Sequence, residues 1–334
     1  MTSGSWRDDI ASARKRWLVT GAAGFIGSHL VEELLRLDQV VTGLDDFSTG
    51  YRHNLDRVEA AVGPARWRGF SLVTGDVRDL DTCERATTGT AYVLHEAALG
   101  SVPRSMKDPL STHAVNVDGT VNVFLAALNA GVEKVVFASS SSVYGDEPSL
   151  PKVENRTGRP LSPYAATKQT AELYANTLCR THQLPAVGLR YFNVVGTRQD
   201  PDGPYAAVVP RWIAAMRAGN RPVIYGDGET SRDFCPVANV VQANLLAAVS
   251  DETTNGRVYN IALGGQTTLN ELFASLRAAL AAQGIECETT EPVYEDFRPG
   301  DIRHSLADIS SAASDFGYAP DVTLAQGLTQ TVEG

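Results

Sequence analysis

Short apolar runs and helical apolar patterns alternate through the first half of the chain. The runs have the length of strands and fall at residues 16–20, 39–44, 70–74, 91–95 and 134–139. Between them, apolar residues recur at the spacing of an amphipathic helix over residues 25–37, 79–87 and 111–130. Strands that alternate with helices form a parallel sheet with helices on both faces. The pattern therefore predicts an α/β fold with a doubly wound parallel sheet.

The last third of the chain is less regular. It carries Pro- and Gly-containing loops at residues 198–204, 219–228 and 298–301. We therefore predict a main domain over residues 16–190, to which some later segments return, and a smaller C-terminal α/β lobe for substrate binding, made mainly by residues 191–334. Residues 1–15 carry several charges and no apolar run, so we expect a frayed extension and no signal peptide.

The segment TGAAGFIG, residues 20–27, joins the first predicted strand to the first predicted helix. Gly21 permits a tight turn, Gly24 lets the backbone approach a pyrophosphate, and Gly27 lets helix and strand pack closely. The phosphates then lie at the helix N-terminus, where unpaired N–H groups point outward. The sheet is thus predicted to be of the Rossmann type. The alternative for this pattern alone is a Gly-rich turn without a ligand.

The second predicted strand ends in two carboxylates, Asp45 and Asp46. Asp45 lies close to the spacing of about 20 residues expected for the acid that binds an adenosine ribose. A carboxylate there accepts hydrogen bonds from a free 2′-hydroxyl and repels a 2′-phosphate. The sequence therefore favours NAD over NADP, with a solvated strand end as the alternative interpretation of Asp45.

Two further strand ends carry candidate cofactor residues. Asp76 and Val77 follow the third strand, where an adenine ring would lie, although Asp76 is equally well interpreted as the N-cap of the next helix. Ala97, Ala98 and Leu99 follow the fourth strand and leave room for a ligand at the carboxyl edge of the sheet. Asn116 falls in a predicted helix and is either a ligand contact or a polar surface residue.

A Ser, Tyr and Lys set indicates proton-transfer chemistry. The fifth strand runs into four serines, residues 139–142, and Tyr164 follows with Lys168 four positions later. Residues at i and i+4 share one helix face, and an ammonium beside a phenol lowers the pKa of the phenol. Tyr164 is then a base near neutral pH, and a serine hydroxyl shares its proton. Such Tyr/Lys pairs also arise by chance, but the upstream NAD pattern and the serine run favour the catalytic interpretation.

Composition restricts the partners and the compartment. A net charge of −10 argues against nucleic acid as a general partner, so an anionic substrate requires a local arginine cluster. The four cysteines are widely spaced and the histidines scattered, which predicts reduced thiols in a cytoplasmic protein and no metal site. We expect no membrane span, because no apolar run approaches about 18 residues. The helical patterns at 111–130 and 164–182 have wide apolar faces, which suit either a four-helix homodimer interface or ordinary core helices.

Taken together, TGAAGFIG, the Asp45–Asp46 pair, SSSSVYG, YAATK and RYFNVVG resemble the extended short-chain dehydrogenase/reductase superfamily. The resemblance covers nearly the whole chain. Within the superfamily, the chain is similar to nucleotide-sugar 4-epimerases, and most to bacterial UDP-N-acetylglucosamine 4-epimerases. The segments that carry this similarity are HEAALGSVPRS (95–105), GLRYFNVVGTRQDPDGPYAAVVPRW (188–212), GDGETSRDF (226–234) and RPGDIRHSLAD (298–308).

The resemblance implies a role for each matching residue. Tyr164 is the catalytic base, Lys168 lowers its pKa and binds the nicotinamide ribose, and Ser140 and Ser141 complete the catalytic set. The implied NAD-binding residues are Gly21, Gly24, Phe25, Ile26, Gly27, Asp45, Asp46, Ser48, Gly50, Asp76, Val77, Ala97, Ala98, Leu99, Asn116, Tyr164, Lys168 and Tyr191. The implied residues for a UDP-sugar are Gly100, Ser101, Ser140, Ser141, Ser142, Asn193, Ala207, Val208, Tyr225, Arg232, Arg298, Asp301 and Ser305.

The implied reaction interconverts UDP-GlcNAc and UDP-GalNAc through transient oxidation at carbon 4 of the sugar. Dehydratases and decarboxylases of the superfamily carry acids just after the partner serine, where this chain has Ser141 and Ser142, so dehydration is disfavoured. Ser305 stands where members restricted to simple hexoses often carry tyrosine, which leaves room for an N-acetyl group. UDP-glucose and UDP-galactose, or the N-acetylated uronic acid forms, stay open as substrates, as does a non-catalytic NAD-binding regulatory protein.

Arg232 and Arg298 are expected to supply the positive charge that a diphosphate needs, through charge-assisted hydrogen bonds. The alternative for each arginine is an ion pair with a neighbouring carboxylate, Asp233 or Asp301.

Overall fold

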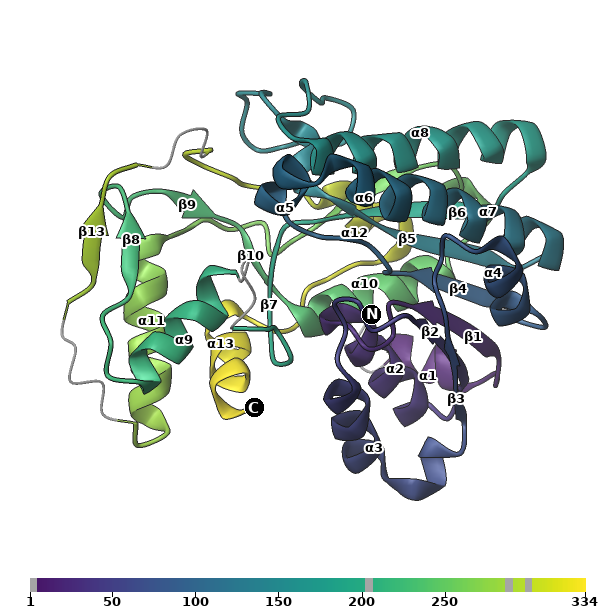
Figure 1. Cartoon of the computed structure of the whole chain (residues 1–334), viewed down its shortest axis with the longest axis horizontal. Helices are drawn as coiled ribbons and strands as arrows, with labels where there is room; N and C mark the ends of the chain where they lie inside the picture. The colour runs from purple at the N-terminus through teal and green to yellow at the C-terminus, as the bar shows by residue number, and fades with distance from the viewer. Residues whose placement is uncertain (1–4, 202–206, 286–290, 298–301) are drawn as a thin grey trace.

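A seven-stranded parallel sheet forms the centre of the molecule (Figure 1). The computed structural model describes residues 5–201, 207–285, 291–297 and 302–334. The strands, in their order across the sheet, are β11 (Val258–Ile261), β6 (Ala186–Tyr191), β5 (Lys134–Ser140), β4 (Tyr92–His95), β1 (Arg16–Thr20), β2 (Val40–Asp45) and β3 (Phe70–Thr74). The order reverses direction between β1 and β4, which opens a crevice at their carboxyl ends. The predicted doubly wound α/β sheet is confirmed.

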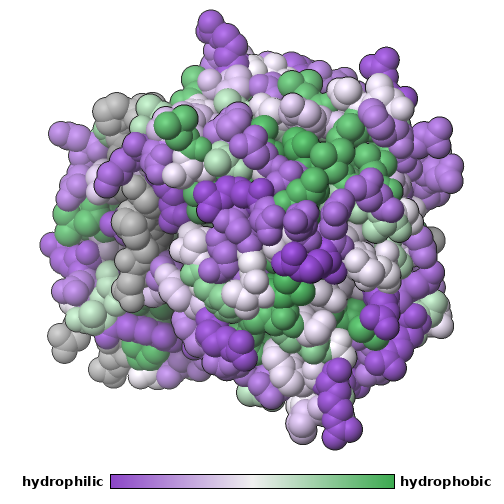
Figure 2. Space-filling view, turned by 45° about the vertical axis from the view of Figure 1, so that its right-hand side comes forward, coloured by the Kyte–Doolittle hydropathy of each residue, from purple (hydrophilic) through white to green (hydrophobic). Residues whose placement is uncertain are grey.

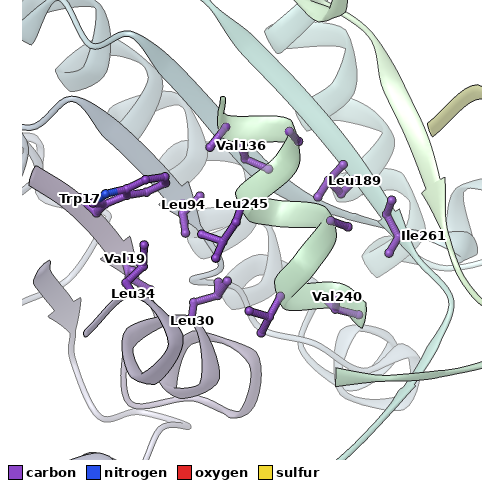
Figure 3. Close-up of a cluster of buried hydrophobic side chains, with 14 of the residues drawn as sticks. Trp17, Val19, Leu30, Leu34, Leu94, Val136, Leu189, Val240, Leu245 and Ile261 are labelled. Atoms are coloured by element: carbon purple, nitrogen blue, oxygen red, sulfur yellow. The ribbon is translucent and has the colours of Figure 1, made fainter. Parts of the chain in front are cut away.

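Helices cover both faces of the sheet because each central strand is apolar on both sides. Trp17 and Val19 of β1 belong to one core cluster, and Leu18 between them belongs to another. The first face carries α2 (Phe25–Arg36), α3 (Arg52–Trp67, kinked at Gly63) and α10 (Val237–Ala248). The second carries α4 (Leu80–Thr87), α7 (Gly119–Ala130) and α8 (Pro163–His182). Figure 3 shows α10 lying across the strands, with Val240 and Leu245 among the core side chains of the first face.

The predicted strands agree with the structure to within one or two residues, but the predicted helix over residues 111–130 is interrupted. It consists of α6 (Pro109–His113), the π-helical segment η1 (Ala114–Asp118) and α7. A π-turn inserts one extra residue into a helix and often marks a functional position. Here it contains Asn116, whose side chain is almost fully buried.

A smaller lobe lies beside the carboxyl edge of the sheet, on the left of Figure 1. Three strand pairs contribute to it, namely β7 (Asn193–Val195) with β10 (Phe234–Pro236), β8 (Val223–Tyr225) with β13 (Val293–Glu295), and β9 (Ser231–Arg232) with β12 (Thr267–Thr268). Its helices are α9 (Val208–Arg217), α11 (Leu269–Ala282) and α13 (Leu324–Glu333), which share a separate core around Trp212, Leu272 and Leu328. Two C-terminal segments, α10 and β11, return to the main sheet, and α12 (Ser310–Phe316) packs on β11.

Short helical segments complete the described chain. They are α5 (Val102–Lys107) and the 3₁₀ turns η2 (Ser141–Tyr144) and η3 (Glu252–Thr254). Among the described residues, no helix has the length and hydrophobicity needed to cross a membrane.

The described part of the N-terminal segment, from residue 5, is not frayed, contrary to our expectation. It forms α1 (Ser5–Ala11), and the side chains of Trp6 and Ile10 are buried in the core of the first sheet face. Arg7 also contacts Glu33 of α2 through a 2.6 Å ion pair. The i, i+4 pair of Trp6 and Ile10 is the apolar signal that the surrounding charges concealed, because two apolar residues on one helix face are enough to anchor two turns.

Candidate active site

The Gly-rich turn is built so that backbone alone lies at its tip. The helix α2 begins after Gly24, which caps it with extended backbone and without a side-chain hydrogen bond. Gly21 adopts a left-handed φ of 68°, and a Cβ atom on it would lie 2.9 Å from the Ala97 nitrogen. A Cβ on Gly27 would lie 2.0 Å from the Gly21 oxygen. The first-turn N–H groups of α2 therefore face a space that side chains do not fill, as phosphate binding requires.

A cavity of about 320 Å³ lies at this turn, in the crevice between β1 and β4. Its lining runs from Asp45 and Gly50 at one end to Tyr164, Lys168 and Tyr191 at the other. The predicted cofactor residues in the lining are Gly21, Gly24, Phe25, Ile26, Gly27, Asp45, Asp46, Ser48, Gly50, Asp76, Val77, Ala97, Ala98, Leu99, Tyr164, Lys168 and Tyr191. The structure thus brings together the predicted cofactor set, apart from Asn116.

The carboxylate of Asp45 holds the Gly-rich turn in place. It accepts the backbone N–H groups of Ala23 and Phe47, each at 2.8 Å, and burial raises its pKa. The solvated strand end that we weighed as an alternative is not observed, because Asp45 is buried. An ionised carboxylate has about four acceptor sites, so Asp45 retains capacity for ribose hydroxyls.

Asp76 does not cap the following helix, since the N-cap of α4 is Asp79. Its carboxylate instead binds the guanidinium of Arg78, and this hydrogen bond lowers the pKa of Asp76. The N-cap interpretation of Asp76 is therefore wrong.

Asn116 fixes the loop after β4 and does not lie on the surface. Its Oδ1 accepts the Leu99 N–H at 2.8 Å, and its Nδ2 donates to the Leu99 carbonyl and to Thr167 Oγ1 on α8. The π-turn of η1 directs this side chain inward. Asn116 thus connects the cavity wall at Leu99 to the helix that carries Tyr164 and Lys168.

Tyr164 lies in the first turn of α8, which starts sharply because Ser162 caps it and Pro163 opens it. Lys168 follows one turn later, and its Nζ donates to the Ala138 carbonyl at 2.8 Å. Burial lowers the pKa of Lys168 to about 8. The pKa of Tyr164 is raised, first by burial and then by the charge of Glu96, while a hydrogen bond with Ser140 lowers it.

The pKa of Tyr164 is shifted in the direction opposite to our expectation. We expected the ammonium of Lys168 to lower the pKa of Tyr164, but the structure shows burial as the dominant cause and a shift in the opposite direction. The spacing of the two residues is right, yet sequence spacing does not reveal how deeply the phenol is buried.

The serine turn lies beside Tyr164. Ser140 Oγ accepts the Ser142 N–H at 3.2 Å at the start of η2, and Ser142 Oγ is buried without a described hydrogen-bond partner. Within the described ranges, Ser140, Ser141 and Ser142 do not line the cofactor cavity or the larger cavity described next. Ser140 nevertheless forms a side-chain hydrogen bond with Tyr164, which lowers the pKa of the phenol.

A second cavity of about 920 Å³ lies under the lobe and shares Tyr164 with the first. The predicted substrate residues in its lining are Ser101, Asn193, Ala207, Val208, Tyr225 and Arg232, while Gly100 lines the cofactor cavity. Arg298 and Asp301 lie outside the described residues. Ser305 lies beside β9, where its N–H donates to the Ser231 carbonyl at 3.1 Å, and it does not line either cavity as described.

The arginine expected to grip the diphosphate is positioned by backbone. Arg232 donates to the carbonyls of Ser231 and Arg303, while the fully buried carboxylate of Asp233 accepts N–H groups of Leu263, Gly264 and Ala307. Asp233 thus serves the loop geometry around Arg232.

Several lining residues escaped the sequence analysis. Arg211, Trp212 and Arg221 line the larger cavity, and Glu96 lines the cofactor cavity. The Glu96 carboxylate accepts the Tyr191 hydroxyl at 2.7 Å, and burial raises its pKa to about 7. Its position in HEAALG was visible in the sequence, but its partner is 95 positions away.

Comparisons with known proteins agree with this geometry. Residues 17–262 match the NAD dependent epimerase/dehydratase family. UDP-glucose 4-epimerase of Mycolicibacterium smegmatis is 40% identical over 95% of this chain and 97% of its own. The UDP-N-acetylglucosamine 4-epimerase of Methanobrevibacter ruminantium, solved with UDP-N-acetylmuramic acid, is 42% identical with a TM-score of 0.87 and covers 96% and 97%. The UDP-glucuronic acid 4-epimerase of Bacillus cereus, solved with UDP-glucuronic acid and NAD, is 29% identical with a TM-score of 0.84 and covers 95% and 98%.

The family match and the two-lobed site place the chain in the class of NAD-dependent enzymes that act on nucleotide sugars. The chain belongs to the NAD dependent epimerase/dehydratase family. NAD is its cofactor, and the residues fit it, since a side-chain-free helix N-terminus faces the same cavity as a buried acid at the end of β2.

Proposed function

We propose that the protein interconverts UDP-GlcNAc and UDP-GalNAc by epimerisation at carbon 4 of the sugar. The observation that carries this proposal is the position of Tyr164, which lines both the NAD cavity and the larger cavity under the lobe. A group that faces both spaces can exchange a proton with a sugar held against the cofactor.

The residues divide the chemistry among themselves. When bound, NAD supplies the acceptor and donor of hydride at carbon 4. Tyr164 takes the proton of the carbon-4 hydroxyl and returns it to the 4-keto sugar, and Ser140 shares that proton. Lys168 keeps a positive charge beside the site below its pKa of about 8. Arg232 binds the diphosphate, which pulls the sugar toward Tyr164.

The first test is a conversion assay without added cofactor. Purified protein is incubated with UDP-GlcNAc, and UDP-GalNAc is sought by chromatography or NMR, with UDP-glucose and UDP-GlcNAcA in parallel. Conversion of UDP-GlcNAc supports the proposal and a retained cofactor. Preference for another pair would show that the substrate is a simple or a uronic acid sugar nucleotide. If no sugar is converted even with NAD added, the epimerase assignment for these sugars is wrong and a non-catalytic NAD-binding role is favoured.

Ser305 is expected to set the sugar size that the site accepts. Ser305 itself does not line the larger cavity, but its backbone is fixed against β9 beside Arg232, which does, so we expect a larger side chain to add volume near the bound diphosphate-sugar. Ser305→Tyr should lower kcat/KM for UDP-GlcNAc by roughly 10- to 100-fold relative to UDP-glucose, the size of a pocket-volume effect. Ser305→Ala is the matched control and should keep the wild-type ratio. An unchanged ratio in the tyrosine variant would contradict this role.

We propose that the protein is a homodimer through an apolar face on α5, α6 and α8. Its exposed large apolar side chains are Met106 (63%), Leu110 (82%), Leu173 (65%) and Tyr174 (43%). Figure 2 shows hydrophobic side chains gathered in the upper part of the molecule, at the height where Figure 1 draws these helices. Phe124 of α7 is in the core, so the expected α7 contribution comes instead from α6.

Analytical ultracentrifugation of the wild-type protein should show a dimer. The double variant Leu110→Glu, Leu173→Glu should be a folded monomer, because both charges fall on the exposed apolar face. A wild-type protein that sediments as a monomer would contradict the proposed dimer.

A further inference from the structure

Glu96 is a half-buried acid in the cofactor cavity for which the proposed reaction has no role. It is the first residue after β4 and lines the cavity together with Tyr164, Lys168 and Tyr191. Its Oε1 accepts the hydroxyl of Tyr191, at the end of β6, at 2.7 Å. An acid in such a cavity is costly unless it is paired, so its environment indicates what it does there.

The hydrogen-bond chain that ends on Glu96 has a fixed direction. Asn244 Nδ2 on α10 donates to the Tyr191 hydroxyl oxygen at 2.8 Å and to the Val240 carbonyl at 2.9 Å. A carbonyl oxygen can only accept, so the nitrogen of the amide and not its oxygen must face Val240, which fixes the orientation of the amide. The single proton of Tyr191 must then point to Glu96, so Glu96 acts as an acceptor. Three elements, α10, β6 and the end of β4, hold an acceptor-only carboxylate in one position.

Two ionisable groups of α8, Tyr164 and Lys168, interact with this carboxylate. Burial raises the pKa of Glu96 to about 7, and the ammonium of Lys168 partly offsets this rise. The charge of Glu96 in turn contributes to the raised pKa of Tyr164 and opposes the lowering of the Lys168 pKa by burial. Tyr191, from β6, keeps its proton because its pKa is raised well above the usual value by burial. His95, the residue before Glu96, is neutral, since burial lowers its pKa to about 3. Tyr191 and His95 are therefore neutral, and Glu96 is the acid among these residues whose ionisation a cation in the cavity would favour.

We propose that Glu96 is a positioning residue that fixes a negative charge at the nicotinamide end of the cofactor cavity and thereby favours the oxidised form of bound NAD. The inference rests on the proposed assignment of Tyr164 and Lys168 as the reacting pair, which places the nicotinamide at this end. The nicotinamide ring is positively charged only when oxidised, and gaining a hydride, which is two electrons and one hydrogen nucleus, removes that charge. A fixed carboxylate stabilises the charged form. An epimerase must regain its oxidised cofactor in every cycle, so this bias opposes trapping of the reduced form.

The test is the reduction potential of the bound cofactor in Glu96→Gln. Glutamine keeps the size of the side chain and an oxygen for Tyr191, but removes the charge. The NAD-loaded protein is equilibrated with mediators of known potential, and the reduced nicotinamide is read from its absorbance. The ratio of reduced to oxidised cofactor at fixed potential should rise roughly tenfold, which corresponds to about 30 mV for a two-electron couple. Glu59→Gln on α3 is the matched control, because it removes the same charge from an exposed position and should leave the potential unchanged. A wild-type potential in Glu96→Gln overturns the proposal.

A second measurement needs no substitution, so it remains possible if the Glu96→Gln protein does not retain NAD. If the carboxylate of Glu96 stabilises the oxidised ring, its pKa must rise when the ring is reduced, and Glu96 then gains a proton. The reduction potential of the wild-type holoprotein should therefore fall more steeply with pH around neutrality than that of free NAD. A slope equal to that of the free couple overturns the proposal. Neither experiment requires turnover of a UDP-sugar, so a wrong substrate assignment leaves the result interpretable.

Discussion

Replacing Tyr164 by phenylalanine is expected to abolish sugar conversion, with kcat lowered by roughly 10²- to 10⁴-fold, the usual contribution of a positioned acid or base. The change removes one oxygen and leaves the ring that lines both cavities. NAD content should therefore stay at the wild-type level, because the Gly-rich turn and Asp45 are untouched. The measurement is kcat with UDP-GlcNAc, together with cofactor content after denaturation.

The pH dependence separates a lost base from a distorted site. Deprotonated Tyr164 is the active base and its pKa is raised by burial, so the wild-type rate should rise with pH. Because the ammonium of Lys168 has the lower pKa of the two, about 8, the rate should stop rising near pH 8, stay level, and fall only above the raised pKa of Tyr164. Tyr92→Phe is the control, since the Tyr92 hydroxyl contacts only surface Glu133 among its described hydrogen bonds. A Tyr164→Phe protein with wild-type kcat would remove Tyr164 from the mechanism.

The fold could be predicted because its signals are local. Each central strand is apolar on both faces, and each helix of the sheet layers repeats its apolar residues at helical spacing, so Trp17, Leu18 and Val19 already identify β1. The π-turn at Asn116 could not be predicted, because one inserted residue barely disturbs an apolar pattern. The helix α1 was missed for a related reason, since only Trp6 and Ile10 mark its buried face.

The candidate site also has a part that could be predicted from local sequence and a part that could not. The Gly-rich turn is contiguous in sequence, whereas Glu96, Tyr191 and Asn244 are brought together from positions 95 and 53 residues apart. The sheet order places the ends of β4 and β6 on one edge, and the packing of α10 on the first face brings Asn244 to them. The direction of the Tyr164 pKa shift was wrong for a similar reason, because burial and the charge of Glu96 are tertiary effects.

Replacing Gly27 by alanine is expected to release NAD and destabilise the fold by about 1–3 kcal/mol, the cost of overpacking. The new Cβ would lie 2.0 Å from the Gly21 oxygen and 2.7 Å from the Gly21 carbonyl carbon, both backbone atoms. Alanine favours a helix over glycine by about 1 kcal/mol, but this gain is offset because α2 must move away from β1.

That movement would open the phosphate site itself. Gly21 has little room to yield, since its own Cβ position lies 2.9 Å from the Ala97 nitrogen, so displacement passes to the N-terminus of α2. Cofactor content and the thermal midpoint should fall together. Gly265→Ala is the matched control, because no atom lies within 4 Å of its Cβ position and both quantities should stay at wild-type values. A Gly27→Ala protein that retains full NAD would show that close packing of α2 on the turn is not needed to hold the cofactor.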